Sequence, residues 1–165
     1  MKSSRDGLLD LLDLFDHAWR RFRARMDGLG DAEWAWQPTP DEHLTLRWRL
    51  RHIAALLREE RNGPWLGLPA GSAPPGAEAA DAADALLRAE EAYAAWRGLL
   101  AALPEGALAA PVGPAAGPYA ASTRRSFALH IADELIHHTA EAALLRDLYA
   151  ATGPADGAQA RTTLP

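Results

Sequence analysis

Apolar residues recur three and four positions apart in four segments of the chain, the spacing that places side chains on one face of an α-helix. These segments predict helices over about residues 6–26, 45–62 and 78–103, and a last helix from Ser122 or Thr123 to about residue 151. The stripe of the first helix comprises Leu8, Leu11, Leu12, Phe15, Ala18, Trp19, Phe22 and Met26. The stripe of the third comprises Leu86, Leu87, Ala89, Tyr93, Trp96, Leu99, Leu100 and Leu103.

Helix breakers separate these segments. Two glycines end the first helix, and Asp31 then resembles the N-cap of a short turn through Glu33 and Trp34. Residues 63–77 and 104–117 are rich in Gly and Pro and predict long connections. Four long helices with unequal loops predict one all-α domain over the whole chain, a four-helix bundle with connections long enough to cross it. The order of the helices stays open, and the last 12 or so residues are expected to form a flexible tail.

Composition narrows the class of protein. The formal charge of -5 argues against a nucleic-acid-binding protein, which needs basic surface to neutralise phosphates. The N-terminal residues do not resemble a signal peptide, and no apolar run approaches the roughly 20 residues of a membrane helix, so we expect a cytoplasmic protein with no membrane contact. The chain has no cysteine, so any thiol chemistry requires a small-molecule thiol. A homodimer through the first or third helix is compatible with the pattern, although no residue requires it.

A polar stripe interrupts the apolar pattern of the last helix. At about 100° per residue, five side chains fall within one arc of roughly 100°, and Leu145 and Leu148 continue that arc. If the stripe faces inward, its imidazoles and carboxylates need partners, because unpaired buried charge is costly. A shared metal ion would satisfy them, whereas a solvated face with ion pairs one helical turn apart is the alternative. The five are His130, Glu134, His137, His138 and Glu141.

Two of these side chains are the first candidates for metal ligands. Glu134 and His138 are four residues apart, so they can hold one ion together. His52, in the middle of the second helix, is the candidate for the third ligand, although a lone histidine is more often structural. Two imidazoles and a carboxylate suit Zn²⁺ first, and also Ni²⁺ or Fe²⁺, and three protein ligands leave a position open for water or substrate. His130 and His137 are held in reserve as ligands.

The chain resembles the DinB-like metal-dependent superfamily, in particular the branch of mycothiol-dependent maleylpyruvate isomerases and bacillithiol S-transferases. Besides the first helix, the resemblance is carried by Asp-Ala-Glu-Trp-Ala-Trp-Gln-Pro at 31–38, Trp-Arg-Leu-Arg-His-Ile at 48–53, Asp-Glu-Leu-Ile-His-His-Thr-Ala-Glu at 133–141 and Leu-Leu-Arg-Asp-Leu-Tyr at 144–149. Many members have three histidines, of which His52 and His138 match the first and the last. Glu134 replaces the middle one, which favours the isomerase branch with its His, Glu, His set.

The resemblance implies a metal centre that activates a low-molecular-weight thiol, such as mycothiol, for transfer to a small-molecule electrophile or for its isomerisation. Arg49 is a candidate anchor for a substrate carboxylate, and Glu59 a candidate acid or base. Surface charge is the alternative for both, since this helix has five arginines. Trp48 is a candidate wall for the cofactor pocket, or else a core residue. A non-catalytic bundle that binds a metal, a ligand or a partner, and a metal-dependent hydrolase, are the alternative functions.

Overall fold

The computed structural model describes residues 4–70 and 78–154, and within these ranges it contains helices and turns but no β-strand. Its long helices are α1 (Ser4–Met26), α3 (Leu46–Leu57), α5 (Ala82–Ala101) and α6 (Arg124–Thr152). Short helices are α2 (Asp31–Ala35) and α4 (Asn62–Trp65), with 3₁₀ turns η1 (Glu42–Leu44), η2 (Ala107–Ala109) and η3 (Pro114–Tyr119). The predicted all-α fold is confirmed. The tail predicted at the C-terminus lies outside the described residues.

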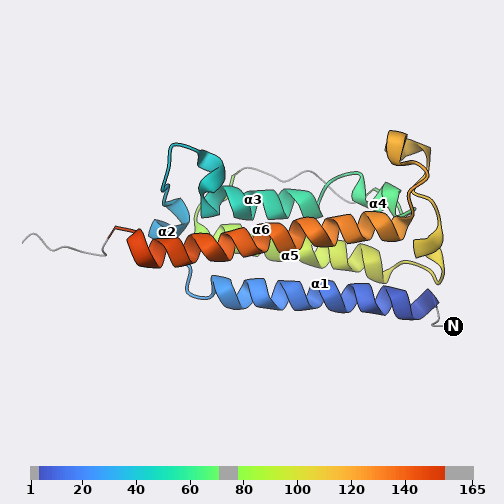
Figure 1. Ribbon diagram of the computed structural model, residues 1–165, viewed down its shortest axis with the longest axis horizontal. Helices are drawn as coiled ribbons and strands as arrows, with labels where there is room; N and C mark the ends of the chain where they lie inside the picture. The colour runs from blue at the N-terminus through green and yellow to red at the C-terminus, as the bar shows by residue number, and fades with distance from the viewer. Residues whose placement is uncertain (1–3, 71–77, 155–165) are drawn as a thin grey trace, which may run out of the picture.

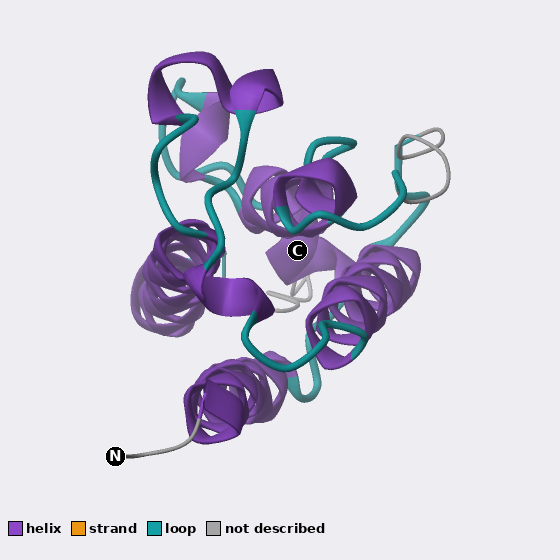
Figure 2. Ribbon diagram, turned by 90° about the vertical axis from the view of Figure 1, so that its right-hand side faces the viewer, coloured by secondary structure: helices purple, strands orange, loops and turns teal. Residues whose placement is uncertain are grey.

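The four long helices run side by side (Figure 1). In that view α1 and α6 run from right to left, whereas α3 and α5 run from left to right. Because α3 and α5 are parallel, a tight hairpin cannot join them, in agreement with the predicted crossing connection. The connection from α5 to α6 joins neighbouring ends at the right of Figure 1, and Figure 2 views the bundle from that end. No helix in the described part of the chain has the length and hydropathy needed to cross a bilayer.

The core lies between these helices. α3 packs against α5 and α6, and α1 packs against α6 and α5. The predicted stripe of the first helix is buried from Leu11 to Met26, and the rings of Phe15 and Trp96 meet edge to face with centroids 5.6 Å apart. Leu87, predicted to belong to the stripe of the third helix, is 57% exposed and is not part of the buried face of α5.

Two predicted helix boundaries are wrong. The second helix ends at Leu57 and not near residue 62, because the Asn62 side chain turns back and donates from Nδ2 to the Leu56 carbonyl at 3.0 Å. This bond satisfies a carbonyl that the helix end leaves without a partner. The third helix begins at Ala82 and not at residue 78, because Asp81 is its N-cap and accepts from the Asp84 amide at 2.8 Å.

Asp31 also differs from its predicted role. Gly30 is the N-cap of α2, and Asp31 is the first residue of that helix. Its carboxylate accepts the backbone N–H of Ala82 at 2.9 Å and thereby ties the start of α2 to the start of α5. The boundaries predicted for the last helix are confirmed within a residue or two, since Thr123 caps its start and accepts from the Ser126 amide at 3.1 Å.

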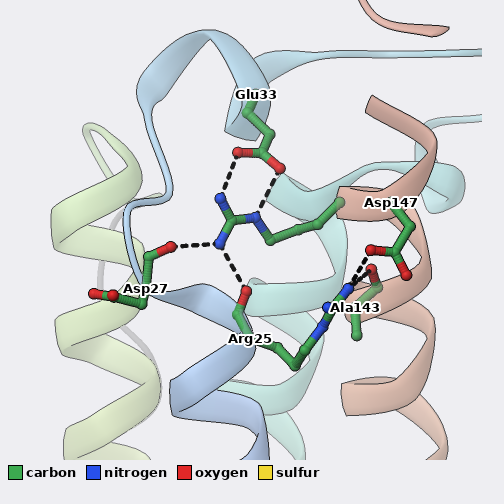
Figure 3. Close-up of polar contacts among 6 residues, drawn as sticks. Arg25, Asp27, Glu33, Ala143 and Asp147 are labelled. Carbon is green, nitrogen blue, oxygen red and sulfur yellow. Dashed lines mark hydrogen bonds and ion pairs between the residues drawn. The ribbon is translucent and has the colours of Figure 1, made fainter. Parts of the chain in front are cut away.

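One arginine joins three helices at the end of the bundle opposite the chain start (Figure 3). Arg146 of α6 donates from Nε and Nη2 to the two carboxylate oxygens of Glu33 on α2, at 2.7 and 2.9 Å. Its Nη1 donates to the carbonyls of Arg25 and Asp27 at the end of α1, each at 2.7 Å. The Arg146 and Glu33 side chains are only 19% and 11% exposed. This bidentate pair therefore fixes the position of α6 relative to α1 and α2.

Candidate metal centre

The three predicted ligands converge between α3 and α6. His52 lies on α3, and Glu134 and His138 lie one turn apart on α6, with one donor atom of each within 4.8 Å of the other two. The Nε2 atom of His138 is 3.3 Å from Oε2 of Glu134. The rings of His52 and His138 meet edge to face with centroids 4.3 Å apart. The structure thus brings together a donor set that the sequence places 82 residues apart in the chain.

Trp48 forms one wall of this cluster. One turn before His52 on α3, its indole stacks on the His52 ring with centroids 4.6 Å apart and planes inclined by 11°. It also approaches the edge of His138, with centroids 6.3 Å apart. Desolvation by this half-buried setting, followed by the neighbouring His138 and Arg49 charges, lowers the pKa of His52 below its usual value. A lowered pKa keeps the imidazole neutral, which is the form that binds metal ions.

Behind His138 lies an ion pair between a buried arginine and a partly exposed glutamate. Arg49, 8% exposed, places Nη1 2.8 Å from Oε2 of Glu141. Both atoms are 3.0 Å from Nδ1 of His138. A neutral Nδ1 either accepts from Arg49 or donates to Glu141, and only the second state leaves the lone pair on Nε2, the nitrogen that faces Glu134. The carboxylate of Glu141 therefore favours the tautomer that can bind a metal through Nε2.

Comparison with known families agrees with this geometry. A family model for the DinB superfamily matches residues 14–142, well over half of the chain. The chain belongs to the DinB superfamily. No curated protein and no solved structure matches it at a significant level. The matched range includes the three donor residues, and DinB proteins generally bind metal ions.

The donor set of this DinB protein fits a divalent ion chemically and in size. Zinc-ligand bonds of about 2.0–2.2 Å in a tetrahedral site place ligand atoms ~3.3 Å apart. Nε2 of His138 and Oε2 of Glu134 already have this separation, at 3.3 Å. The donor atoms of all three residues lie within 4.8 Å of one another, so a short inward movement of the side chains would bring them to the distance that zinc requires. The Glu134 side chain is 35% exposed, so the cluster opens to solvent on one side. A fourth ligand can enter from that side.

A second possible donor set overlaps the first. His137, His138 and Glu141 also have donor atoms within 4.8 Å of one another. This set would place a cation beside Glu141, whose carboxylate is already neutralised by Arg49 at 2.8 Å. The guanidinium repels a second cation there, which favours the set that contains His52.

The other candidates lie outside the donor set. His130 is exposed on α6, and His137 is 62% exposed. Of the two alternatives for the polar stripe, the solvated face applies to His130 and His137, whereas His138 at the other edge of the arc is buried. Glu59, predicted on the same helix as His52, lies beyond the end of α3 at Leu57 and forms an ion pair with Arg61.

Arg49, the candidate anchor for a substrate carboxylate, already has a carboxylate partner in the structure. Its Nη1 points to Glu141 and His138, and its guanidinium carbon lies 4.8 Å from the Trp48 ring centroid. Sequence reasoning missed the role of Glu141 as the partner of His138. Its spacing of three residues from His138 was a usable signal, but the ion pair with Arg49 depends on how α3 packs against α6.

Proposed function

We propose that this protein is a divalent-metal-dependent enzyme that activates a low-molecular-weight thiol for transfer to, or thiol-assisted isomerisation of, a small electrophile. The observation that carries the proposal is the convergence of His52, Glu134 and His138 from two helices on a half-exposed face. Membership of the DinB superfamily is compatible with a metal-dependent enzyme. Three ligands leave a coordination position free, as in catalytic rather than structural sites.

The absence of cysteine supports the thiol part of the proposal. A bound divalent metal supplies Lewis acidity, which lowers the pKa of a coordinated thiol toward neutrality. Since the chain has no thiol of its own, the sulfur must come from a co-substrate. In a transfer the sulfur forms a bond to an electrophilic carbon, and either a leaving group departs with its electron pair or the π bond of an electron-poor C=C breaks and its other carbon takes up a proton. In an isomerisation the sulfur adds to the C=C bond, the former double bond rotates as a single bond, and the carbon–sulfur bond breaks as the double bond forms again and the thiol is released.

The residues of the chain have separate tasks in this scheme. His52, Glu134 and His138 hold the metal, zinc in the first instance with nickel or iron as alternatives. Trp48 covers the His52 side of the site and limits access of water. The His, Glu, His set matches the mycothiol-dependent isomerase branch, so mycothiol in the cytoplasm is the thiol we would test first.

The metal is tested by elemental analysis of protein purified without added metal. We expect about one equivalent of a divalent metal in the wild type and its loss in His52→Ala and His138→Ala. His130→Ala, an exposed histidine on the same helix as His138, is the matched control and should retain the metal. Circular dichroism confirms that each variant is helical. Wild-type protein that binds neither Zn²⁺ nor Ni²⁺ after refolding with them would refute the metal centre.

The thiol is tested separately on cobalt-substituted protein. Coordination of mycothiol should produce a thiolate-to-metal charge-transfer absorption that His138→Ala lacks. An electrophile assay with mycothiol then distinguishes turnover from binding. Full metal content without any thiol-dependent absorption would show that the thiol part is wrong, and would leave a hydrolase or a non-catalytic metal protein.

A further inference from the structure

A hollow lies on the side of α3 that faces away from His52, between α3 and α5. It has a volume of about 280 Å³. At about 100° per residue, its apolar floor of Leu50 and Ala54 lies roughly 160° around α3 from His52. Ala85 of α5 completes the floor, and Trp34 of α2 forms one end. The hollow is therefore separate from the metal donors.

Arginines surround this apolar floor. Arg47 and Arg51 lie four residues apart on one face of α3, Arg58 is the C-cap of that helix, and Arg88 lines the hollow from α5. Glu78 is the only carboxylate among the side chains that line the hollow in the described part of the chain. The whole chain has a formal charge of -5, so four guanidiniums around one hollow do not follow from its overall composition.

Most of these arginines have acidic partners that an anionic ligand can displace. Arg51 pairs with Glu78 at 2.7 Å, and their side chains are 49% and 70% exposed. Arg58 pairs with Glu91 at 3.2 Å, and the Glu91 side chain is 55% exposed. Exposed ion pairs of this kind contribute little stability, so replacing the glutamate by an anionic ligand costs little free energy.

Arg47 differs from the other three. Its guanidinium carbon lies 4.5 Å from the centroid of the Trp34 ring, and within the residues that the structure describes no carboxylate forms an ion pair with it. Packing over an indole restricts the orientations of a guanidinium, whose planar N–H groups bind the two oxygens of a carboxylate or phosphate. Arg47 thus offers a pre-oriented donor at the edge of an apolar floor.

We propose that this arginine-lined hollow binds a small organic anion, with its carboxylate or phosphate against Arg47 and Arg51 and its apolar body on Leu50, Ala54 and Ala85. A small cavity with an apolar floor and a few polar groups at its rim is the usual form of a small-molecule site. Its size accommodates one ring or a short branched chain. The site does not depend on a metal at His52 and is occupied equally in metal-free protein.

The test uses the indole ¹H–¹⁵N resonances of the metal-free protein. Trp34 is suited as a reporter because its Nε1 is buried and has no acceptor in the described structure, so a ligand that moves its ring shifts its signal. Benzoate serves as the probe, because it combines a carboxylate with an apolar ring. Benzyl alcohol keeps the ring without the charge, and inorganic phosphate keeps the charge without the ring. The Trp34 resonance is assigned from Trp34→Phe.

We expect benzoate to shift the Trp34 resonance saturably, and both control ligands to bind at least tenfold more weakly. Arg47→Gln should weaken benzoate binding at least tenfold, whereas Arg20→Gln, an exposed arginine on α1, should leave it unchanged. If Arg47→Gln disturbs the fold, visible as a shift of the buried Trp96 resonance, Arg51→Gln at the exposed rim takes its place. Equal binding of benzyl alcohol and benzoate, or equal affinities in the arginine variants and the control, would overturn the proposal.

Discussion

The hydrogen bond between Glu141 and His138 leads to a quantitative prediction for Glu141→Gln. If the proposed metal binds Nε2 of His138, Nδ1 carries the proton and donates to Oε2 of Glu141, 3.0 Å away. A hydrogen bond to a charged acceptor contributes roughly 1.5–3 kcal/mol. In the metal-free protein His138 has a second arrangement, in which Nδ1 accepts from Arg49 at 3.0 Å, so loss of the carboxylate affects that state less.

The difference between the two states determines the change in metal affinity. We expect Glu141→Gln to weaken metal binding about 10–100-fold, the usual effect of removing the partner of a metal-bound histidine. That range corresponds to ~1.4–2.7 kcal/mol. The assay is competition for Zn²⁺ against a chromophoric chelator at fixed pH, with circular dichroism to confirm the helical content.

Two further variants separate a hydrogen bond from simple loss of negative charge. Asp133→Asn removes one exposed carboxylate beside Glu134 on the same helix, and should change the affinity little. Glu141→Asp keeps the charge but withdraws it by one methylene, and should give an intermediate affinity. If Glu141→Gln and Asp133→Asn have the same affinity, or if Glu141→Asp equals the wild type, Glu141 does not act through His138.

Three predictions concern stability. Arg146→Met should lower the free energy of unfolding by about 2–4 kcal/mol in urea titrations, because it removes a nearly buried bidentate pair. Arg25→Met is the control: it removes an exposed pair and should lower the free energy of unfolding by under about 1 kcal/mol. Equal losses in the two variants would contradict this account. The hydrogen bond from Arg97 lowers the pKa of Asp16, so the stabilisation by that carboxylate is present above the unfolded-state pKa of about 3.9 and is lost as the pH falls through the folded-state pKa. Asp16→Asn should therefore lower Tm at neutral pH, and the difference from wild type should shrink in strong acid; a constant difference would exclude the carboxylate as its cause. Asn62→Ala should cost about 1–2 kcal/mol and increase hydrogen exchange at the end of α3, because a buried carbonyl loses its donor; unchanged exchange there would show that water replaces the amide.

The parts of the site that follow helical spacing were predictable. A pair four residues apart on one helix shares a face wherever the helix packs, so the contact between Glu134 and His138 follows from their numbers alone. The place of His52 beside them was also predicted, from its position in the middle of an amphipathic helix. Helices with strong apolar periodicity were located correctly for the same reason, since the spacing is a local property of the chain.

The parts that depend on packing between helices were not predictable. The polar residues of α6 span a wide arc, and their spacing along the helix does not predict which side of that arc packs against the neighbouring helix. α3 covers the edge with His138 and leaves His130 and His137 exposed. The partner of Arg49 was missed for the same reason, because a guanidinium reaches several positions of a facing helix and only the register of α3 against α6 selects Glu141.

The segments that carry the resemblance to the DinB superfamily divide into two kinds by what they contact. Residues 48–53 and 133–141 meet at the donor cluster and contain its three candidate donors, His52, Glu134 and His138. Residues 31–38 and 144–149 meet elsewhere, through the pair of Glu33 and Arg146, and hold the helices in place. A match at residues 31–38 and 144–149 therefore indicates the fold, whereas only a match at residues 48–53 and 133–141 indicates the chemistry. A chain that kept the Glu33–Arg146 pair but had lost His52 would be expected to fold like this protein without the proposed metal centre.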